Sequence, residues 1–337
     1  MTVRAALEAA IDRDPDDAAA YAVLADHLEE LGDPRGRLIA LQLAAERDPA
    51  LGEAATAYLA VHRDDLARVY EAVTVRWSRG YARAVFADGV QRAYLSSSRR
   101  RETPGAILAH PSSRFLVELG VRDDDGGTEA WVDSLALAAP RGALRRLALT
   151  DHRFAELQLA ALWPAVPALE SLELAGFHGM LGAIALPALR RFAWTPARLT
   201  EANVRELATA AWPQLEELEL LALAEDPPIA TLFETVKMPR LQHLALHGLA
   251  VCTDAVAALA GSALAPALVT LDLSHGRLTD TCIGILNRFH WLERLDVSDN
   301  ALTPAGVARL CGPAHVIAGD QREPDLEDPR DDGLFDY

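Results

Sequence analysis

The stretch that decides the fold is residues 292–310, LERLDVSDNALTPAGVARL. Leu295 and Val297 are separated by one charged residue, which is the period of a half-buried strand. Asn300 then stands in a turn, and Thr303 suits the N-cap of a helix because an apolar i, i+4 face follows it. We therefore expect a short strand, a turn and a helix that returns beside the strand.

The strand pattern of this stretch recurs along the chain with a nearly constant period. The other copies are LVELGV at 116, LRRLAL at 144, LESLEL at 169, LRRFAW at 189, LEELEL at 215, LQHLAL at 241 and LVTLDL at 268. Successive copies start 28, 25, 20, 26, 26, 27 and 24 residues apart. Proline, which cannot continue a helix or donate to a ladder, stands two residues before five of the copies, at Pro167, Pro187, Pro213, Pro239 and Pro266.

This period resembles that of leucine-rich repeats of the ribonuclease-inhibitor class. The resemblance implies an α/β curved solenoid, with a parallel sheet on its concave face and helices on its convex face. Two more outer helices are predicted at 199–207 and 278–286, with Thr200 and Thr279 as their N-caps. The 20-residue step before residue 189 is too short for a normal helix, so we expect an irregular convex side in residues 175–188.

The N-terminal segment has a different sequence pattern, with many alanines and leucines at helical spacing. In residues 31–40, LGDPRGRLIA, Gly32 suits the C′ position of one helix, and Asp33 and Pro34 suit the N-cap and first turn of the next. The two helices resemble a tetratricopeptide helix pair. A single pair cannot bury its own apolar face, so we expect it to cover the open apolar end of the first repeat.

The glycines of LGDPRGRLIA also raise the alternative of a phosphate-binding loop. Such a loop follows a buried strand and carries a Lys-Ser or Lys-Thr pair at the helix mouth. Here a helix precedes the turn, and Arg35 and Arg37 stand at the mouth of the next helix. The sequence therefore favours a turn between two helices.

Residues 24–42, LADHLEELGDPRGRLIALQ, resemble the signature of the repeat-companion domain, a helical module found in bacterial proteins ahead of leucine-rich repeats. The resemblance implies a bacterial source, an interaction role and no catalytic activity. We predict that residues 1–75 form a helical repeat-companion module with a tetratricopeptide-like helix pair and that residues 76–105 form a transition to the first repeat. Residues 106–318 should form a solenoid of about eight repeats, and residues 319–337 an acidic tail.

Composition limits the classes of partner. The 337 residues include 32 Lys and Arg against 49 Asp and Glu, a net charge of -17, which disfavours a nucleic-acid partner because affinity there comes from neutralising phosphates. No stretch reaches the roughly 18 apolar residues of a membrane span, and the N-terminus has no secretory pattern. The three scattered cysteines fit reduced thiols. We expect a cytoplasmic protein without a cofactor; the oligomeric state stays open, with a monomer preferred.

The candidate binding residues lie on the predicted strands. The third, fifth and seventh residues of each copy alternate with the buried leucines and should face the concave side. A strip of small and charged residues there suits recognition of a protein partner; the alternative is a solvated face without a ligand. The candidate partner-binding residues are Arg146, Glu173, Arg191, Glu217, Glu219, His243, His247, Asp272, Arg294 and Asp296.

Within this strip, a histidine invites a chemical interpretation. Neighbouring strands lie about 4.8 Å apart, so His247 could reach Asp272 or Ser274 and form a hydrolytic Ser-His-Asp set or a weak His-carboxylate metal site. No glycine-rich oxyanion loop accompanies these residues in the sequence. We therefore expect no catalytic residue and no metal.

The tail, residues 319–337, has eight acids and no apolar periodicity, which predicts disorder. Its end, GLFDY, is a candidate docking motif with Leu334, Phe335 and Tyr337 as contacts; the alternative is a solubilising tail. We predict a non-enzymatic protein-interaction module that binds a protein on its concave face. The alternative is a regulatory or adaptor subunit that acts through its helical module or its tail, with the repeats as scaffold.

Overall fold

The computed structural model describes residues 3–71, 73–88, 97–123, 127–151, 157–177, 179–196, 198–221, 229–235, 237–248 and 253–322, the side chains of 88, 97–102, 123 and 235 excepted. The predicted docking motif of Leu334, Phe335 and Tyr337, and most of the predicted tail, lie outside the described residues. Within the described residues, no helix is long and apolar enough to cross a membrane.

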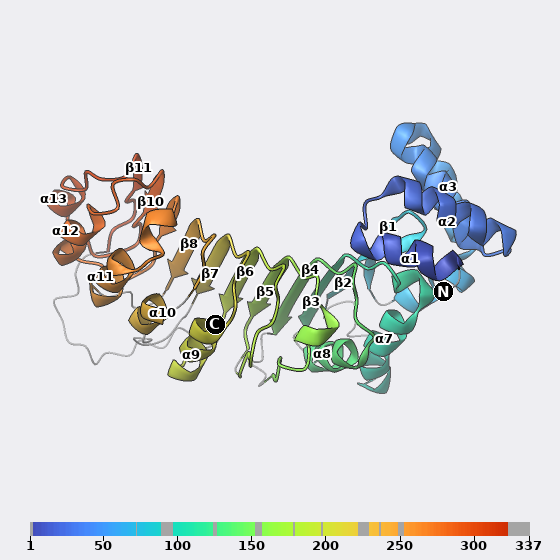
Figure 1. Ribbon diagram of the computed structural model, residues 1–337, viewed down its shortest axis with the longest axis horizontal. Coiled ribbons are helices and arrows are strands. Elements are labelled where there is room, and N and C mark those ends of the chain that lie inside the picture. Colours follow the sequence, from blue (N-terminus) through green and yellow to red (C-terminus); the bar gives the residue numbers. More distant parts are fainter. Residues whose placement is uncertain are drawn as a thin grey trace.

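The described strands form one 11-stranded sheet in chain order (Figure 1). A β1–β2 antiparallel hairpin begins it, and every later pairing is parallel. The strands are β1 Thr74–Ser78, β2 Tyr81–Asp88, β3 Glu118–Asp123, β4 Arg146–Asp151, β5 Ser171–Ala175, β6 Arg191–Thr195, β7 Glu217–Leu221, β8 His243–His247, β9 Thr270–Asp272, β10 Arg294–Asp296 and β11 His315–Ile317. Strands β3 to β10 start at the third residue of the eight predicted copies, so the predicted α/β sheet is confirmed.

The sheet extends beyond the eight predicted copies at both ends. Residues 76–105 were predicted as a transition, but β1 and β2 lie in residues 74–88, and β2 pairs with β3 as one more parallel strand. At the other end, β11 pairs with β10. Both strands lack the leucine that marks the predicted copies; Ala82 and Pro313 stand at that position.

The helices of the repeats lie on one face of the sheet, with α7 to α10 below the strands in Figure 1 and α12 and α13 at its left end, where the last repeats curve upward. They are α7 Ser97–Ala109, α8 Thr128–Leu137, α9 Glu201–Thr209, α10 Ile229–Thr235, α11 Thr253–Gly261, α12 Ile283–Leu286 and α13 Pro304–Val307. Short 3-10 turns join them: η3 Pro111–Ser113, η4 Trp163–Ala165, η5 Ala265–Ala267 and η6 Asp280–Cys282. The last two α-helices are single turns, shorter than the sequence pattern suggested.

The predicted N-caps are confirmed at two of three positions. Thr200 forms a capping box with Asn203 at the start of α9, and the hydroxyl of Thr303 accepts a bond from the Gly306 N–H at 3.0 Å. Thr279 occupies the N-cap position of η6 but makes no capping bond; its hydroxyl lies 2.9 Å from that of Thr281.

The convex side is irregular where the short repeat step predicted it. Between β5 and β6 the described residues contain no helix. Helix α9 holds this loop, because the carboxylate of Glu206 accepts the N–H groups of Leu181 at 2.9 Å and Gly182 at 3.1 Å. Asn203 donates to the Gly179 carbonyl at 2.9 Å, and Gly179 has φ 135°, a conformation that side chains disfavour.

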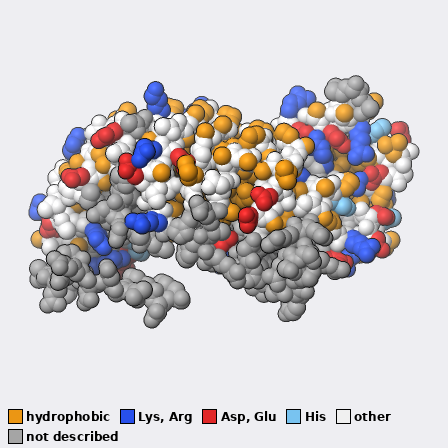
Figure 2. Space-filling model, turned by 90° about the horizontal axis from the view of Figure 1, so that it is seen from below, with side chains coloured by type: hydrophobic (Ala, Val, Ile, Leu, Met, Phe, Trp, Pro, Cys, Tyr) orange, Lys and Arg blue, Asp and Glu red, His pale blue; other side chains and the backbone are white. Residues whose placement is uncertain are grey.

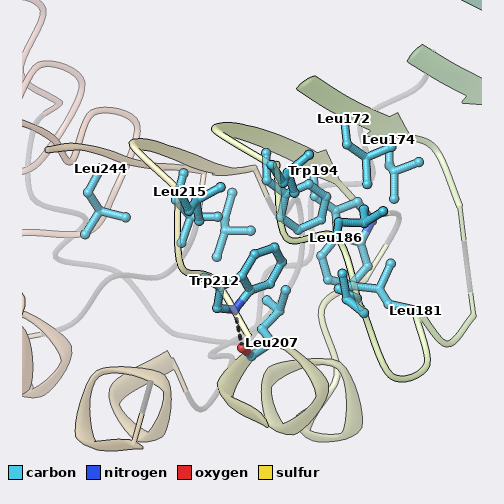
Figure 3. Packing of buried hydrophobic residues seen from close by; sticks show 14 of the residues in the cluster. Leu172, Leu174, Leu181, Leu186, Trp194, Leu207, Trp212, Leu215 and Leu244 are labelled. Atoms are coloured by element: carbon cyan, nitrogen blue, oxygen red, sulfur yellow. Dashed lines mark hydrogen bonds between the residues drawn. The ribbon is translucent and has the colours of Figure 1, made fainter. Parts of the chain in front are cut away.

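The repeat core is a continuous ladder of buried leucines with large aromatic residues between layers (Figure 3). Trp212 stacks on Phe192 with ring centroids 5.6 Å apart, and its indole N–H donates to the Leu207 carbonyl at 2.9 Å. Each fully buried leucine contributes about 1.5–3 kcal/mol relative to exposure. Seen from the helix side, hydrophobic side chains gather over the middle of the molecule, and Lys and Arg lie toward its two ends (Figure 2).

The N-terminal helices rise at one end of the sheet. They are α1 Val3–Arg13, α2 Ala18–Glu30, α3 Pro34–Arg47, α4 Gly52–Val61 and α5 Arg63–Leu66, with 3-10 turns η1 Pro49–Leu51 and η2 Arg68–Tyr70. The turn between α2 and α3 is the one predicted: Gly32 has φ 72°, and the Asp33 carboxylate accepts the Arg35 N–H at 3.0 Å. A Cβ at Gly36 would lie 2.6 Å from the Ala25 carbonyl oxygen, so this glycine lets α2 and α3 approach closely.

The helix pair does not join the repeat core. It forms its own buried cluster, centred on Tyr21, Leu24 and Leu28, with Tyr81 and Phe115 from the N-terminal ends of the first strands. The expected cover of the open end comes from the last part of the N-terminal module, where Tyr70 and Val73, together with Trp77 on β1, pack on the repeat core.

Candidate functional site

The predicted outward positions are at least partly open to solvent, except Ala193, Ser274 and Asp296, which are buried. In β5, Leu172 and Leu174 are buried, whereas Ser171 is half-buried and Glu173 exposed. Strand pairing aligns these positions into two rows that cross the sheet. The first row contains Glu118, Arg146, Ser171, Arg191, Glu217, His243, Thr270 and Arg294. The centre row contains Gly120, Ala148, Glu173, Ala193, Glu219, Ala245, Asp272 and Asp296.

The helices cover the lower face of the sheet over β3 to β8 (Figure 1), and the two rows alternate with the leucines buried beneath those helices, so the rows belong to the opposite, upper face. The N-terminal helices rise above this side at one end of the sheet, and the last repeats rise above it at the other (Figure 1). This side is therefore concave, and we call it the concave face. Arg146, Arg191 and Arg294 lie in its first row and Glu173, Glu219 and Asp272 in its centre row, as the spacing predicted.

One arginine on this face is surrounded by three carboxylates from two neighbouring strands. The guanidinium of Arg191 lies 3.2 Å from Glu217, 3.3 Å from Glu219 and 3.9 Å from Glu173. All four side chains are 40–53% exposed, so each pair contributes at most about 1 kcal/mol. Three negative charges against one positive charge leave excess acidity at this point.

Beside Arg191 the face has an open hollow of about 270 Å³. The hollow lies over Ala245, whose short side chain leaves room between the centre-row acids Glu219 and Asp272. Its other polar walls are Arg191, Glu217, His243, Thr270 and Arg294. Sites for drug-sized ligands enclose about 300–1,000 Å³. The hollow is slightly smaller than that range, which fits one side chain of a partner.

The structure brings together the histidine, serine and aspartate that the sequence placed within reach. His247 Nδ1 lies 3.2 Å from the Ser274 hydroxyl, and His247 Nε2 lies 3.5 Å from an Asp272 carboxylate oxygen. Ser274 is only 6% exposed, and its N–H donates to Asp272 at 2.9 Å. The three groups thus satisfy one another at the end of β9 and present no accessible nucleophile.

His243 has a different partner, since its Nδ1 lies 2.8 Å from the Thr270 hydroxyl on the next strand. In the part of the chain that the structure describes, no group of three or more His, Cys, Asp or Glu side chains is placed to hold a metal ion. The histidines of the concave face therefore act as hydrogen-bonding groups that fix neighbouring side chains.

Asp296 differs from the expectation that it faces a partner, because it is only 8% exposed. Its carboxylate accepts bonds from the Ser298 hydroxyl at 2.6 Å, the Ser298 N–H at 3.1 Å and the Arg294 guanidinium at 3.3 Å. Burial alone would raise the pKa of Asp296, but these bonds outweigh it and the pKa lies below its ordinary value. Asp296 therefore holds the turn after β10.

Two further residues of the concave face were missed from the sequence because the hairpin was not predicted. The Phe86 ring covers Gly120, where a Cβ would lie 2.8 Å from it, and the guanidinium of Arg76 lies 5.8 Å from the ring centroid. Glu118 pairs with Arg76 at 3.7 Å and with Arg146 at 3.0 Å. The alternation in YARAVFAD was the signal that could have revealed this strand.

Comparison with known proteins supports the architecture. A crystal structure of a Bacteroides fragilis protein matches with a TM-score of 0.52 and 17% identity, covering 82% of this chain and 85% of that one. The two chains share a fold. An internalin from Listeria monocytogenes matches with TM-score 0.40 and 16% identity over 72% and 69% of the two chains. A chain of the Rad7 and Elc1 complex in yeast matches with a TM-score of 0.35 and 15% identity, covering 61% of this chain and 68% of that one.

No protein-family model matches the chain, and no curated protein matches it. The repeat-companion resemblance of residues 24–42 and the bacterial source therefore stay predictions. What the structure shows is an α/β chain with a long, mostly parallel open sheet.

Proposed function

We propose that the protein is a non-enzymatic recognition module that binds a protein partner on its concave face. The observation that carries this proposal is the group of outward carboxylates on β5 to β9: Glu173, Glu217 and Glu219 surround Arg191, and Glu217, Glu219 and Asp272 line the hollow together with Arg191 and Arg294. The leucines between them are buried in a continuous core, so the rows sit on a rigid support.

The dimensions of the face favour a protein over a small ligand. Eight strand spacings separate β2 from β10, which is about 38 Å at about 4.8 Å each. Stable protein interfaces bury about 800 Å² on each partner, and a face of this width can supply that area. The open hollow is lined by β6 to β10, so about half of the width of the face lies outside it.

The proposal is tested by blocking the face without changing its charge. Ala148 and Ala245 lie in the centre row, and their replacement by tyrosine should fill the space that a partner needs. A partner is first captured with the wild-type chain and identified by mass spectrometry, and its affinity is then measured with purified proteins. We expect A148Y and A245Y to weaken binding by at least about 100-fold.

The matched control is Ala161→Tyr, since Ala161 is exposed in the segment between β4 and β5, outside both rows. This variant should bind as the wild type does. Unchanged affinity of both concave variants would refute the proposal. It would favour the alternative, a regulatory or adaptor subunit acting through residues 1–75 or the tail, which truncation after residue 322 would then test.

We also propose a reducing compartment, the cytoplasm, for this protein. Cys282 is buried and Cys311 is exposed, and both are free thiols. Exposed free thiols persist in reducing compartments. Proteomic fractionation of the source cell tests this assignment.

A further inference from the structure

Charge is distributed unevenly along the concave face. On strands β5 to β9, the four outward carboxylates Glu173, Glu217, Glu219 and Asp272 outnumber the arginines, because only Arg191 lies among them and Arg294 on β10 is the second arginine of the hollow. At the other end, the pairing is reversed, because the two arginines Arg76 and Arg146 flank one carboxylate, Glu118. The face therefore has an acidic part over β5 to β9 and a basic part over β1 to β4.

The acidic part contains a place of the right size for one cation. Glu219 and Asp272 lie on either side of Ala245, two strand spacings or about 10 Å apart. The hollow of about 270 Å³ lies between them, and both carboxylates line it. Their side chains are 44% and 29% exposed, so each carboxylate is accessible to a group that enters the hollow.

Neither carboxylate is fully satisfied by its own neighbours. Glu219 shares Arg191 with two other acids, and Asp272 accepts one backbone N–H from Ser274 and lies 3.5 Å from His247. An incoming ammonium or guanidinium would gain charge-assisted hydrogen bonds to both, which are stronger than neutral ones. In a partly enclosed site, such bonds favour a partner of matching charge and oppose an acidic one.

We propose that the partner presents a lysine or arginine side chain that enters the hollow between Glu219 and Asp272. The same segment carries an acidic group that meets Arg146, four strand spacings from Ala245, about 19 Å away. Ala193, in the centre row on β6, lies between the two contacts, and its short side chain leaves room for the backbone of the segment. This inference rests on the proposed function and adds to it the charge and direction of the partner.

The first experiment uses a defined probe. Acetylated tetralysine is coupled to the full chain with a water-soluble carbodiimide, which joins lysine amines to nearby carboxylates, and the joined residues are located by peptide mass spectrometry. We expect coupling to concentrate on Glu219 and Asp272 and to fall at least about tenfold in the presence of tetra-arginine that is acetylated and amidated at its ends. Coupling spread evenly over surface acids, including Glu170 and Glu216, would overturn the proposal.

The second experiment uses matched neutralised variants and the captured partner. E219Q/D272N removes two charges from the hollow and keeps side-chain size. E170Q/E216Q removes two charges at the starting ends of strands, where Glu170 and Glu216 pair with Arg145 at 3.2 Å and Arg190 at 2.9 Å. At about 50 mM salt we expect at least about tenfold weaker binding for the first variant and little change for the second, with the difference shrinking as salt rises.

The blocking variants separate the two proposals. If A148Y and A245Y lose the partner while E219Q/D272N retains full affinity, the charge inference fails and the proposed function stands. If all of them retain the partner, the proposed function fails as well. Thermal unfolding of E219Q/D272N should match the wild type, because the amide oxygen introduced by D272N can still accept the Ser274 N–H.

Discussion

The two ends of the sheet are closed in different ways. At the N-terminal end, Tyr70, Val73 and the antiparallel strand β1 cover the repeat core, and the helix pair adds a separate cluster around Tyr21 and Leu24. At the C-terminal end, the three-residue strand β11 follows a single-turn helix. There the side chains of Asn300 and Gln321 bond the backbone of the last turns.

The difference shows two ways to close the end of a solenoid. At one end a separate apolar cluster lies beside the sheet, and at the other end side-chain amides form hydrogen bonds with the backbone of the last turns. The N-terminal helices are tied to the sheet through polar contacts, such as Arg114 to Asp12, Arg83 to Asp16 and Arg79 to Glu46, and their buried cluster includes Tyr81 and Phe115 of the sheet. Regions with a core of their own can open as cooperative units, whereas repeats share core with their neighbours. We therefore expect the helix pair to unfold independently and the C-terminal end to unfold with the repeats.

The largest expected effect comes from Leu24→Ala. Leu24 is fully buried in the helix-pair cluster, and its truncation should cost about 4 kcal/mol of local stability. Hydrogen exchange should accelerate across α2 and α3 and stay unchanged in β8 to β10. Leu244→Ala, in the repeat core, is the matched control: it should accelerate hydrogen exchange in β8 to β10 and leave α2 and α3 unchanged. Equal acceleration in both regions for either variant would show that the two cores form one unit.

A slightly smaller effect is expected from Asn300→Ala. Asn300 is fully buried; its amide donates to the carbonyls of Leu273, Val297 and Ser298, and its oxygen accepts the Leu278 N–H. Truncation leaves buried backbone groups without partners, so we expect a loss of about 3 kcal/mol in the free energy of unfolding. Urea unfolding measures it.

Gln321→Ala is the matched variant one repeat further on. Gln321 occupies the corresponding turn, donates to the Val297 carbonyl at 2.8 Å and accepts the Leu302 N–H at 3.0 Å, but it is only half-buried. Water can replace these bonds in part, and we expect a loss of about 1 kcal/mol. A loss as large as that of Asn300→Ala would show that the last turn is as protected as the interior repeats.

The contrast also explains what could be predicted from the sequence. Strands β3 to β10 were predicted because a leucine period of 20 to 28 residues is a strong signal. Strands β2 and β11 were not, because Ala82 and Pro313 stand at the leucine position. At the N-terminal end, Tyr70 and Trp77 from outside the repeats help to form the core where the first strand carries small residues. A search for a repeated leucine period therefore does not find the strands at the two ends of the solenoid.

The same limit applies to the candidate site. Alternation along each strand predicted that Glu173, Glu219 and Asp272 face outward, because that depends only on local geometry. The burial of Asp296 depends on Arg294 and Ser298, which cover it, and the stacking of Phe86 over Gly120 depends on a neighbouring strand. Such cross-strand contacts have no signature in a single strand.

A small effect is expected where the helix pair meets the sheet. Arg114 pairs with Asp12 at 2.8 Å and lies 5.1 Å from the Phe115 ring centroid, but its side chain is 36% exposed. Exposed pairs contribute at most about 1 kcal/mol, so Arg114→Gln should lower the stability of the helix pair by that amount or less. A loss above about 2 kcal/mol, seen by hydrogen exchange in α1 and α2, would mean that ion pairs rather than the apolar cluster join the two parts.

The smallest effect concerns pH at the N-terminal end of the sheet. Burial, and secondarily the charge of Arg35, lower the pKa of His110, whose Nδ1 accepts the Ser112 N–H at 3.2 Å and whose ring packs against Tyr70. The unfolded chain takes up a proton near pH 6.5 and the folded chain only at lower pH, so the unfolded state binds more protons between the two values. The stability due to this group is therefore present above pH 6.5 and decreases as the pH falls below it. His110→Asn keeps a capping acceptor and does not titrate. Urea unfolding at pH 7.5, 6.5 and 5.5 should show a smaller loss on acidification in this variant than in the wild type, and identical losses would mean that His110 takes up its proton equally in both states.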